Sequence, residues 1–482
     1  NTAVGFQAGY ANTTGVDLTA IGISALKANT TGSTNTAVGG AALTANTTGG
    51  QNVAFGNAAL LSSTTGSFNV ALGRSALLSN TTASNNTAVG YQAGYSNNQS
   101  SITAIGFQAL YNNANTLNTA VGYQALYANT SGQAVTAVGF LALGSNTSGS
   151  RNTAVGYQAG HSNTTGENNS SFGQTALGNT TTGSNNSAHG YDALQANTTG
   201  AYNTAMGKDA LKSNTTASEN TAVGQLALQA NTTGSSNIAF GRASLYANTT
   251  ASYNTAYGTD SLQVNTTGHS NTAVGHRTLI SNTTANVNTV MGYQAGYLNT
   301  TGQGNVVVGQ GAMYNNITGG GNTLIGREAG FYVTGGGNVV IGSPSAGATA
   351  YTPVFNITSE NNYISMGNSN ITNAYVKVAW TVTSDARDKS NFAEVPHGLS
   401  FVNQLAPSSY EFKLKRGEDE TDGIVRYGFK AQDILALEGD NPVIIDNQNP
   451  DSLRYRETAL IPILAKAVQE LSAKNDALEA RL

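Results

Sequence analysis

The chain has 482 residues, of which only 10% are charged, and its 57 glycines contrast with seven prolines and a net charge of −4. So small a charge argues against a nucleic-acid partner, and the absence of cysteine excludes disulfides and thiolate metal sites. Nothing in the composition predicts a metal or a cofactor. The sequence starts inside a repeat, without a basic n-region or an apolar run of about 18 residues, so we expect no signal peptide, no membrane span and a missing natural N-terminal region.

A 17-residue repeat occupies residues 1–342. The motif NTAVG places its glycine at Gly5 and then in every unit up to Gly342, with steps of 17 residues except for three steps of 16. A short fixed period is typical of a solenoid, in which each unit covers the apolar face of the next. We therefore predict a mainly β protein with a parallel β-solenoid shaft of 21 units, roughly 100 Å long at about 4.8 Å per strand.

Residues of the NTAVG motif alternate between the two faces of the predicted strand. The column that starts at Val4 is apolar in nearly every unit, and we expect it to form the stacked core. The column that starts at Ala3 is almost all alanine, which favours a surface where the backbone of a partner chain comes close. His189 and Tyr257 interrupt the apolar column, and we interpret them as packing variants.

The NTTG segment predicts the corners of each coil. Asparagine tolerates left-handed conformations, glycine adopts positive φ freely, and Asn or Thr side chains can bond to the local backbone. Each unit should then hold a strand, a second short extended segment and two turns. The N-x-T triplets also match glycosylation acceptors, but we prefer the corner interpretation.

The core NTAVGYQA resembles the left-handed β-roll repeats in the head domains of trimeric bacterial adhesins, where S-V-A-I-G-x-x-A recurs. The resemblance covers residues 1 to about 342 and is architectural, because the unit here is longer. It implies a homotrimer and no particular ligand.

The repeat ends after Gly342, and residues 343–383 contain two alternating stretches, YISMG and AYVKVAWTVT, that predict a β-rich neck. Charge then rises sharply. Residues 1–342 hold 15 charged side chains, whereas residues 384–482 hold 29. This contrast predicts a separate domain of mixed α and β structure at 384–482.

The last segment, 457–482, is predicted to be a helix. Its apolar residues recur at alternating steps of four and three, which is typical of a coiled-coil seam, with one buried asparagine that sets the register. A helix packed only on its own domain is the alternative. The seam comprises Leu464, Val468, Leu471, Asn475, Leu478 and Leu482.

Four motifs follow one another in the C-terminal domain: SDARDK, GLSFVNQLAPSSYEFK, YGFKAQDI followed by NPVIID, and LRYRETALIPILAKAVQEL. In this order they resemble the C-terminal intramolecular chaperone auto-processing domain of phage tailspikes and endosialidases. In that family the domain trimerises, guides the upstream β-fibre to fold, and cuts itself off. The resemblance implies that Ser384 is the nucleophile, that Lys389 is the base, and that the bond between Thr383 and Ser384 is cleaved.

This chemistry is sensible for the residues involved. A serine hydroxyl needs a base to remove its proton, and a lysine can serve once desolvation favours its neutral form. Because nucleophile and substrate bond lie in one segment, the reaction gains from proximity and runs once per chain. We thus expect a single-turnover autoproteolytic serine endopeptidase. Asp385 and Asp388 suit a helix start or a turn, and Arg387 suits a surface charge or a partner of Asp388.

The sequence departs from the family pattern at one position. Relatives often carry a histidine two residues before the glycine of GF-x-AQ, where this chain has Arg426. Arginine cannot act as a base at neutral pH, so we expect cleavage to be slower or absent even if chaperoning persists. His397 is a candidate replacement, with a solvated or structural histidine as the alternative.

These features predict a tail fibre or spike of a phage or phage-like particle, made in the host cytoplasm and carried on the virion or as an extracellular appendage. Such a fibre implies a host-surface receptor, carbohydrate or protein, and attachment through the missing N-terminal region, without nucleic acid or membrane. A bacterial trimeric surface adhesin is one alternative, but we expect it to end in a membrane-anchoring segment, of which NDALEARL is not typical. A polysaccharide-degrading tailspike is another, but it needs clustered carboxylates, and residues 1–342 hold only seven, spread apart.

Overall fold

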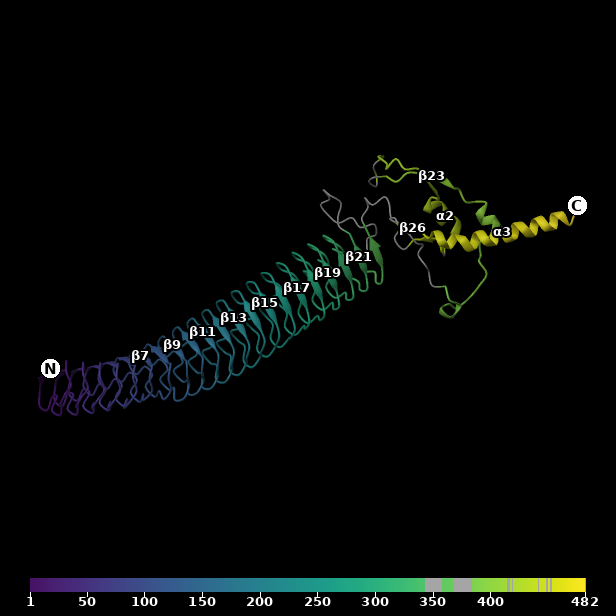
Figure 1. Cartoon of the computed structure of the whole chain (residues 1–482). Coiled ribbons are helices and arrows are strands. Elements are labelled where there is room, and N and C mark those ends of the chain that lie inside the picture. Colours follow the sequence, from purple (N-terminus) through teal and green to yellow (C-terminus); the bar gives the residue numbers. More distant parts are fainter. Residues whose placement is uncertain are drawn as a thin grey trace. The chain divides into compact units, whose positions relative to one another are not determined.

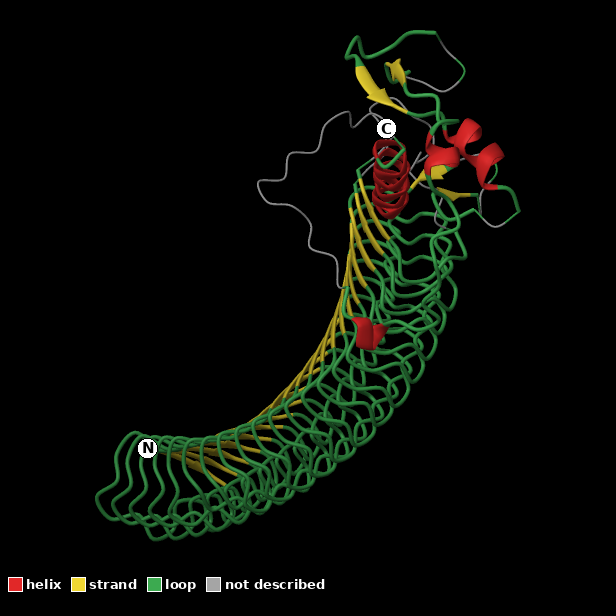
Figure 2. Cartoon of the chain, turned by 90° about the vertical axis from the view of Figure 1, so that its right-hand side faces the viewer, coloured by secondary structure: helices red, strands yellow, loops and turns green. Residues whose placement is uncertain are grey.

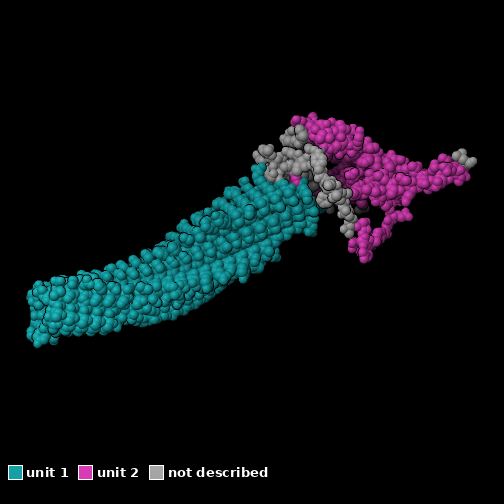
Figure 3. All heavy atoms as spheres, viewed as in Figure 1, with its two compact units in different colours: residues 1–344, 357–366 teal, residues 345–356, 367–482 magenta. Residues whose placement is uncertain are grey.

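The computed structural model describes residues 1–342, 358–367, 384–413, 417, 419–440, 442–447, 450 and 453–481. The chain divides into two compact units (Figure 3). The first comprises Asn1–Pro344 and Ile357–Met366, and the second Ser345–Asn356 and Gly367–Leu482.

The first unit is a parallel β-solenoid, as predicted (Figures 1 and 2). Each coil contributes one three-residue strand, and successive strands pair in register, so that Thr36 lies beside Val53. The stack continues beyond Gly342, because the YISMG stretch supplies a strand that pairs with the preceding one; the stretch AYVKVAWTVT lies outside the described residues. The strands of this sheet are β1 (Thr2–Val4), β2 (Thr19–Ile21), β3 (Thr36–Val38), β4 (Val53–Phe55), β5 (Val70–Leu72), β6 (Thr87–Val89), β7 (Thr103–Ile105), β8 (Thr119–Val121), β9 (Thr136–Val138), β10 (Thr153–Val155), β11 (Ser170–Phe172), β12 (Ser187–His189), β13 (Thr204–Met206), β14 (Thr221–Val223), β15 (Ile238–Phe240), β16 (Thr255–Tyr257), β17 (Thr272–Val274), β18 (Thr289–Met291), β19 (Val306–Val308), β20 (Thr323–Ile325), β21 (Val339–Ile341) and β22 (Ile364–Met366).

The prediction of which strand face forms the core is wrong. The alanine column points inward, and Ala37 and Ala54 are completely buried. The column that starts at Val4 points outward, so that Phe55 is 56% exposed. The interior of the coil is narrow and in most coils is already filled by a fully buried leucine from the turn after the strand, such as Leu43, which leaves room only for a small side chain on the strand.

A compensating exchange late in the solenoid supports this explanation. In the coil of β20 the strand carries Leu324 in the alanine column, and the leucine of the following turn is replaced by Gly330. A Cβ atom on Gly330 would lie 2.9 Å from Cδ1 of Leu324. In this coil the interior therefore holds one large side chain, contributed by the strand and not by the turn, which agrees with the close packing of protein cores.

The NTTG corners rest on buried asparagine side chains that bond to the local backbone, as predicted, but the NTTG residues are not left-handed, contrary to the prediction. Nδ2 of Asn46 donates to the carbonyl of Gly49, at 2.9 Å, and to Oδ1 of Asn29 in the preceding coil, at 2.7 Å. The left-handed residues lie instead in the turn after the strand, as at Ala41 and Leu43, and two positions after the corner glycine, as at Gln51. The expected second extended segment is not a strand in any described coil. Because Asn46 and its equivalents are buried, the folded corners do not present them as glycosylation acceptors.

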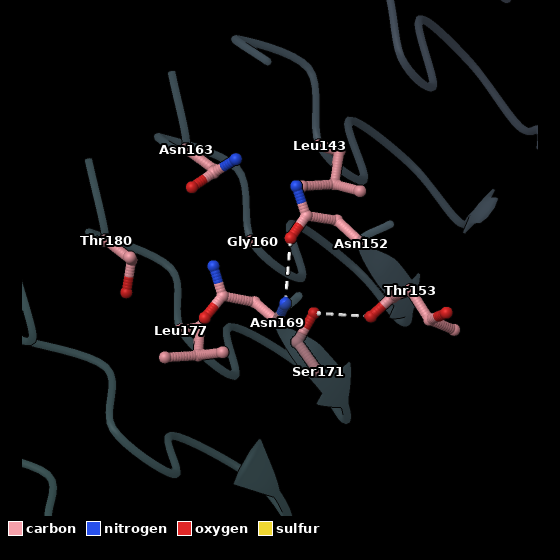
Figure 4. Close-up of a pocket in the computed structure, with 9 residues that line it drawn as sticks. All are labelled: Leu143, Asn152, Thr153, Gly160, Asn163, Asn169, Ser171, Leu177 and Thr180. Carbon is pink, nitrogen blue, oxygen red and sulfur yellow. Dashed lines mark hydrogen bonds between the residues drawn. The ribbon is translucent and has the colours of Figure 1, made fainter. Parts of the chain in front are cut away.

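The corner asparagines of successive coils form a ladder of side-chain hydrogen bonds, such as that of Asn46 to Asn29. One interruption of this asparagine ladder borders a small internal cavity, shown in Figure 4. Thr180 replaces the corner asparagine of its coil, and Gly160 replaces a core leucine between Leu143 and Leu177. As a result, Oδ1 of Asn163 is buried without a hydrogen-bond partner. An unpaired buried acceptor costs about 1–3 kcal/mol.

Replacing Thr180 by asparagine should restore the ladder and raise the free energy of unfolding by ~1 kcal/mol, because the new amide can donate to Asn163 Oδ1. Denaturant titration of the full chain measures the change. The matched control is Thr182→Asn at an exposed position of the same corner, for which we expect no gain. A Thr180→Asn protein that is no more stable than the control would contradict this account of the cavity.

The second unit has mixed α and β structure, as predicted. Its core contains Phe401, Ile434, Ile444, Ile445, Leu460 and Ile463. Two antiparallel pairs are formed by β23 (Ser408–Tyr410) with β24 (Arg426–Gly428) and by β25 (Ile445–Asp446) with β26 (Arg454–Tyr455). The helices are the 3₁₀ turn η1 (Ala386–Asp388), α1 (Leu399–Val402), α2 (Ala431–Glu438) and α3 (Glu457–Glu479).

The C-terminal helix α3 starts at the predicted residue, Glu457, and has two apolar faces. One face is buried against its own domain through residues that the predicted seam does not include, namely Leu460, Ile463 and Ala467. The seam itself is exposed, with Leu464 at 41% and Val468 at 65%. Packing on the domain therefore leaves the seam free. Nδ2 of Asn475 donates to its neighbour Glu479 on the same helix, and Leu482 lies outside the described residues.

Candidate functional site

Ser384 and Lys389 lie side by side at the beginning of the described C-terminal residues. Nζ of Lys389 donates a hydrogen bond to Oγ of Ser384 over 2.6 Å. A nucleophile within hydrogen-bond reach of a basic side chain is the first geometric requirement for activating a serine. Thr383, on the other side of the expected cleavage site, lies outside the described residues.

A single 3₁₀ turn, η1, brings these two residues together. Asp385 caps the turn by accepting from the backbone N–H of Arg387, and the turn closes with a hydrogen bond from Lys389 N to the carbonyl of Ala386. The Arg387 guanidinium also binds the Asp385 carboxylate, at 2.6 Å, so its partner is Asp385 and not Asp388. These contacts hold the pKa of the Asp385 carboxyl below its usual value. The capped turn thus reverses the chain so that residues five apart face each other.

The segment that carries the pair is exposed to solvent in the single chain. Both Ser384 and Lys389 are exposed, and Phe392, a little further along, is 74% exposed. A lysine accepts a proton only in its neutral form, which removal from water favours. Lys389 Nζ and Ser384 Oγ are therefore within hydrogen-bond distance, but both side chains lie in solvent in the single chain.

The two candidate accessory residues have other partners. The ring of His397 packs against Phe401, with centroids 4.3 Å apart, which is a structural contact. Arg426 pairs with Asp422 at 2.7 Å and lies over the ring of Phe412, 4.8 Å from its centroid. Among the described residues, no hydrogen bond or ion pair joins either side chain to the serine–lysine pair.

Two residues of α3 that sequence reasoning missed hold the chain just after this pair. Nζ of Lys466 donates to the carbonyl of Val395 over 2.6 Å, and Oε2 of Glu470 accepts from the backbone N–H of Leu399 over 2.8 Å. Gly398 has no side chain with which to cap α1, so the Glu470 carboxylate takes that role. The only signal in the sequence is the four-residue spacing, which places both side chains on one side of a helix.

Four of the seven acidic side chains of residues 1–342 form ion pairs. Asp192 and Asp209 both bind Lys212, at 2.8 and 3.0 Å, and Asp260 binds Arg242 at 3.0 Å. The hydrogen bonds that Lys212 donates to the two aspartates raise the pKa of Lys212. Aspartates that face cations in this way are poorly suited to the general acid role of a glycosidase, which requires a protonated carboxyl.

No group of three or more His, Cys, Asp or Glu side chains in the described ranges converges on a possible metal site. Where the structure describes a helix, that helix is too short or too polar to cross a bilayer.

Residues 384–441 match the Peptidase S74 family, described as chaperone of endosialidase. The C-terminal unit carries a chaperone-of-endosialidase domain. The match starts at Ser384, two residues before the 3₁₀ turn η1. No curated protein and no solved structure matches the chain. A domain of this peptidase family behind a β-solenoid fits a tail-fibre or endosialidase-type protein, and it suggests a virion-associated fibre or spike with an autoproteolytic C-terminal chaperone.

Proposed function

We propose that this protein is a homotrimeric tail fibre or spike whose C-terminal chaperone domain drives trimeric folding and then cleaves itself off before Ser384. The observation that carries the proposal is the hydrogen bond between Lys389 Nζ and Ser384 Oγ at the first residue of the family match. In this role the shaft serves as a rod on a phage or phage-like particle, with a host-surface carbohydrate or protein as its receptor.

The reaction follows from these two side chains. Neutral Lys389 takes the proton of the Ser384 hydroxyl, and Oγ attacks the preceding carbonyl carbon, that of Thr383. The C–N bond breaks, the Ser384 nitrogen gains a proton, and the acyl group rests on Oγ as an ester. Water then hydrolyses the ester, which leaves a carboxylate on Thr383 and a free amino group on Ser384. Each chain reacts once.

A chaperone of this kind answers a folding problem of the shaft. Successive coils have nearly the same sequence, so a shift by one coil keeps almost the same core. A trimeric domain at one end sets the register from which the coils can propagate. Its removal leaves a kinetically trapped rod, because unfolded chains have lost the domain that aligned them.

Homotrimer assembly is supported by two apolar surfaces that the single chain leaves exposed. One is the α3 seam, and the other is the outward strand column that starts at Val4. This column carries no Asp, Glu, Lys or Arg from Val4 to Met366, and its two departures, His189 and Tyr257, stack on the aromatic residue of the preceding coil. A second copy of the chain has the same coil spacing, so it can match the column coil by coil. The partner surface proposed here is thus the Val4 column and not the alanine column.

Expression of the whole chain tests the proposal. We expect mass spectrometry to find a released fragment with Ser384 as its N-terminal residue, and light scattering to find three chains in the remaining shaft. Residues 1–383 made alone should aggregate or stay unassembled. An intact chain within a formed trimer would refute the cleavage but leave the chaperone role, whereas correct trimers from residues 1–383 would refute the chaperone role.

Cysteine cross-linking tests the proposed trimer surface, since the natural chain has no cysteine. Val138→Cys lies in the outward strand column, so three copies should meet near the trimer axis, and mild oxidation should yield disulfide-linked dimers. Ser148→Cys, at an exposed corner of the same coil, is the control and should remain monomeric under denaturing conditions. Cross-linking of Ser148→Cys without cross-linking of Val138→Cys would place the interface on another face.

A further inference from the structure

We propose that Lys466 and Glu470 are positioning residues through which the packing of α3 controls autoprocessing. This inference rests on the proposed self-cleavage and assigns a regulatory link to the same site. Residues 384–394, which contain the serine and lysine, are called the cleavage segment below.

The cleavage segment has few attachments of its own. The hydrogen bonds of its described side chains are local, within the capped 3₁₀ turn. Apart from the backbone hydrogen bonds of α1 itself, the hydrogen bonds and ion pairs that join described residues 384–399 to the rest of the unit come from α3: Lys466 to the carbonyl of Val395, Lys466 to Glu394 at 3.8 Å, and Glu470 to the N–H of Leu399. Helix α3 is therefore the polar anchor for the C-terminal end of the cleavage segment.

The fit around Glu470 is close. A Cβ atom on Gly398 would lie 2.3 Å from Oε1 of Glu470, so the carboxylate sits directly against the backbone of the residue before α1. The contact is charge-assisted, because an ionised carboxylate accepts from a backbone N–H at a helix start, and such bonds are stronger than neutral ones. Loss of the carboxylate removes both the anchor and the cap of α1.

Packing of partner helices on α3 can affect the cleavage segment because the faces of α3 make different contacts. Leu460 and Ile463 are buried in the domain core, Lys466 and Glu470 hold the chain that leads out of the cleavage segment, and Leu464 and Val468 are exposed on the seam. When partner helices cover the seam, α3 becomes fixed relative to the other chains. The anchored cleavage segment then becomes fixed relative to them as well, and a neighbouring chain can cover the serine–lysine pair. A loose segment would not present the pair at a constant place.

Variants of the two anchors test the inference in the full-length chain. We expect Glu470→Ala and Lys466→Met to form trimers but to release the domain roughly 10-fold to 100-fold more slowly, since small displacements of reacting groups cost rates of this order. Glu470→Gln should be intermediate, because its amide oxygen can still accept the Leu399 N–H. The matched controls, Asp476→Ala and Lys474→Met, change exposed charges on the same helix and should react like the wild type.

Trimer yield and thermal midpoint, measured beside the release rate, separate positioning from stability. The inference is overturned if Glu470→Ala trimers react at the wild-type rate, or if the release rate falls only in proportion to lost trimer. If the wild type does not cleave at all, the proposed self-cleavage is refuted. Hydrogen exchange, measured in chains that also carry Ser384→Ala, then tests separately whether Lys466 and Glu470 anchor the cleavage segment. Faster exchange of the amides of residues 390–399 in Glu470→Ala than in Asp476→Ala supports the anchor, and equal exchange rejects it.

Discussion

Ser384→Ala is expected to abolish release of the C-terminal domain while trimers still assemble. Alanine removes the oxygen to which Lys389 Nζ donates and with it the nucleophile, and loss of such a group lowers the rate by on the order of 10⁴-fold or more. Denaturing electrophoresis should show one full-length band for the variant and two bands for the wild type. Light scattering on the same samples checks that the number of chains is unchanged.

Substitutions of Lys389 distinguish a base from a mere charge. Lys389→Met should stop release as completely as Ser384→Ala does. Lys389→Arg keeps the positive charge but cannot accept a proton at neutral pH, so it should be equally inactive. Lys413→Met, which removes an exposed lysine paired with Asp419 in the same unit, is the control and should cleave normally. Near-normal release from Lys389→Arg would show that another group acts as the base.

Gly39→Ala should destabilise the coils around β3 strongly. Gly39 has φ of +132°, which L-residues rarely adopt, and a Cβ atom there would lie 2.6 Å from the carbonyl oxygen of Gly56 in the next coil. Backbone atoms cannot yield as a flexible side chain can. We expect a cost of at least ~3 kcal/mol, from the combined strain and overlap.

The adjacent glycine supplies the control for this prediction. Gly40 lacks the left-handed φ of Gly39, and the nearest atom to its Cβ would be Nδ2 of the Asn57 side chain, at 3.2 Å. Gly40→Ala should therefore change stability little. Because coils of a solenoid contact only their neighbours, the effect should be local. Hydrogen exchange of the amides of β2 to β4 measures this loss of stability. Equal protection in Gly39→Ala and Gly40→Ala would show that glycine at Gly39 and its equivalents is not needed for close stacking of the coils.

The sequence by itself determined the features that depend on local pattern. The 17-residue spacing of the NTAVG glycine located the strands, and the rise in charge near residue 384 indicated a second domain. The last segment was predicted to be helical from about Glu457, where α3 begins. The resemblance carried by SDARDK and the three motifs after it pointed to Ser384 and Lys389, and in the structure a single turn brings these two side chains together. Whether the pair is catalytic remains a prediction.

Only the tertiary structure decided which strand face is the interior. The alternation of residues along a strand separates its two faces but does not say which face is enclosed by the coil. That choice depends on the volume of the side chain in the following turn, as the exchange of Leu324 and Gly330 shows. The asparagine ladders and the α3 anchors escaped prediction for the same reason. Asn46 bonds to the preceding coil, and Glu470 reaches an N–H that lies 71 residues away in the chain. Such contacts exist only after distant segments have packed, so no local pattern records them.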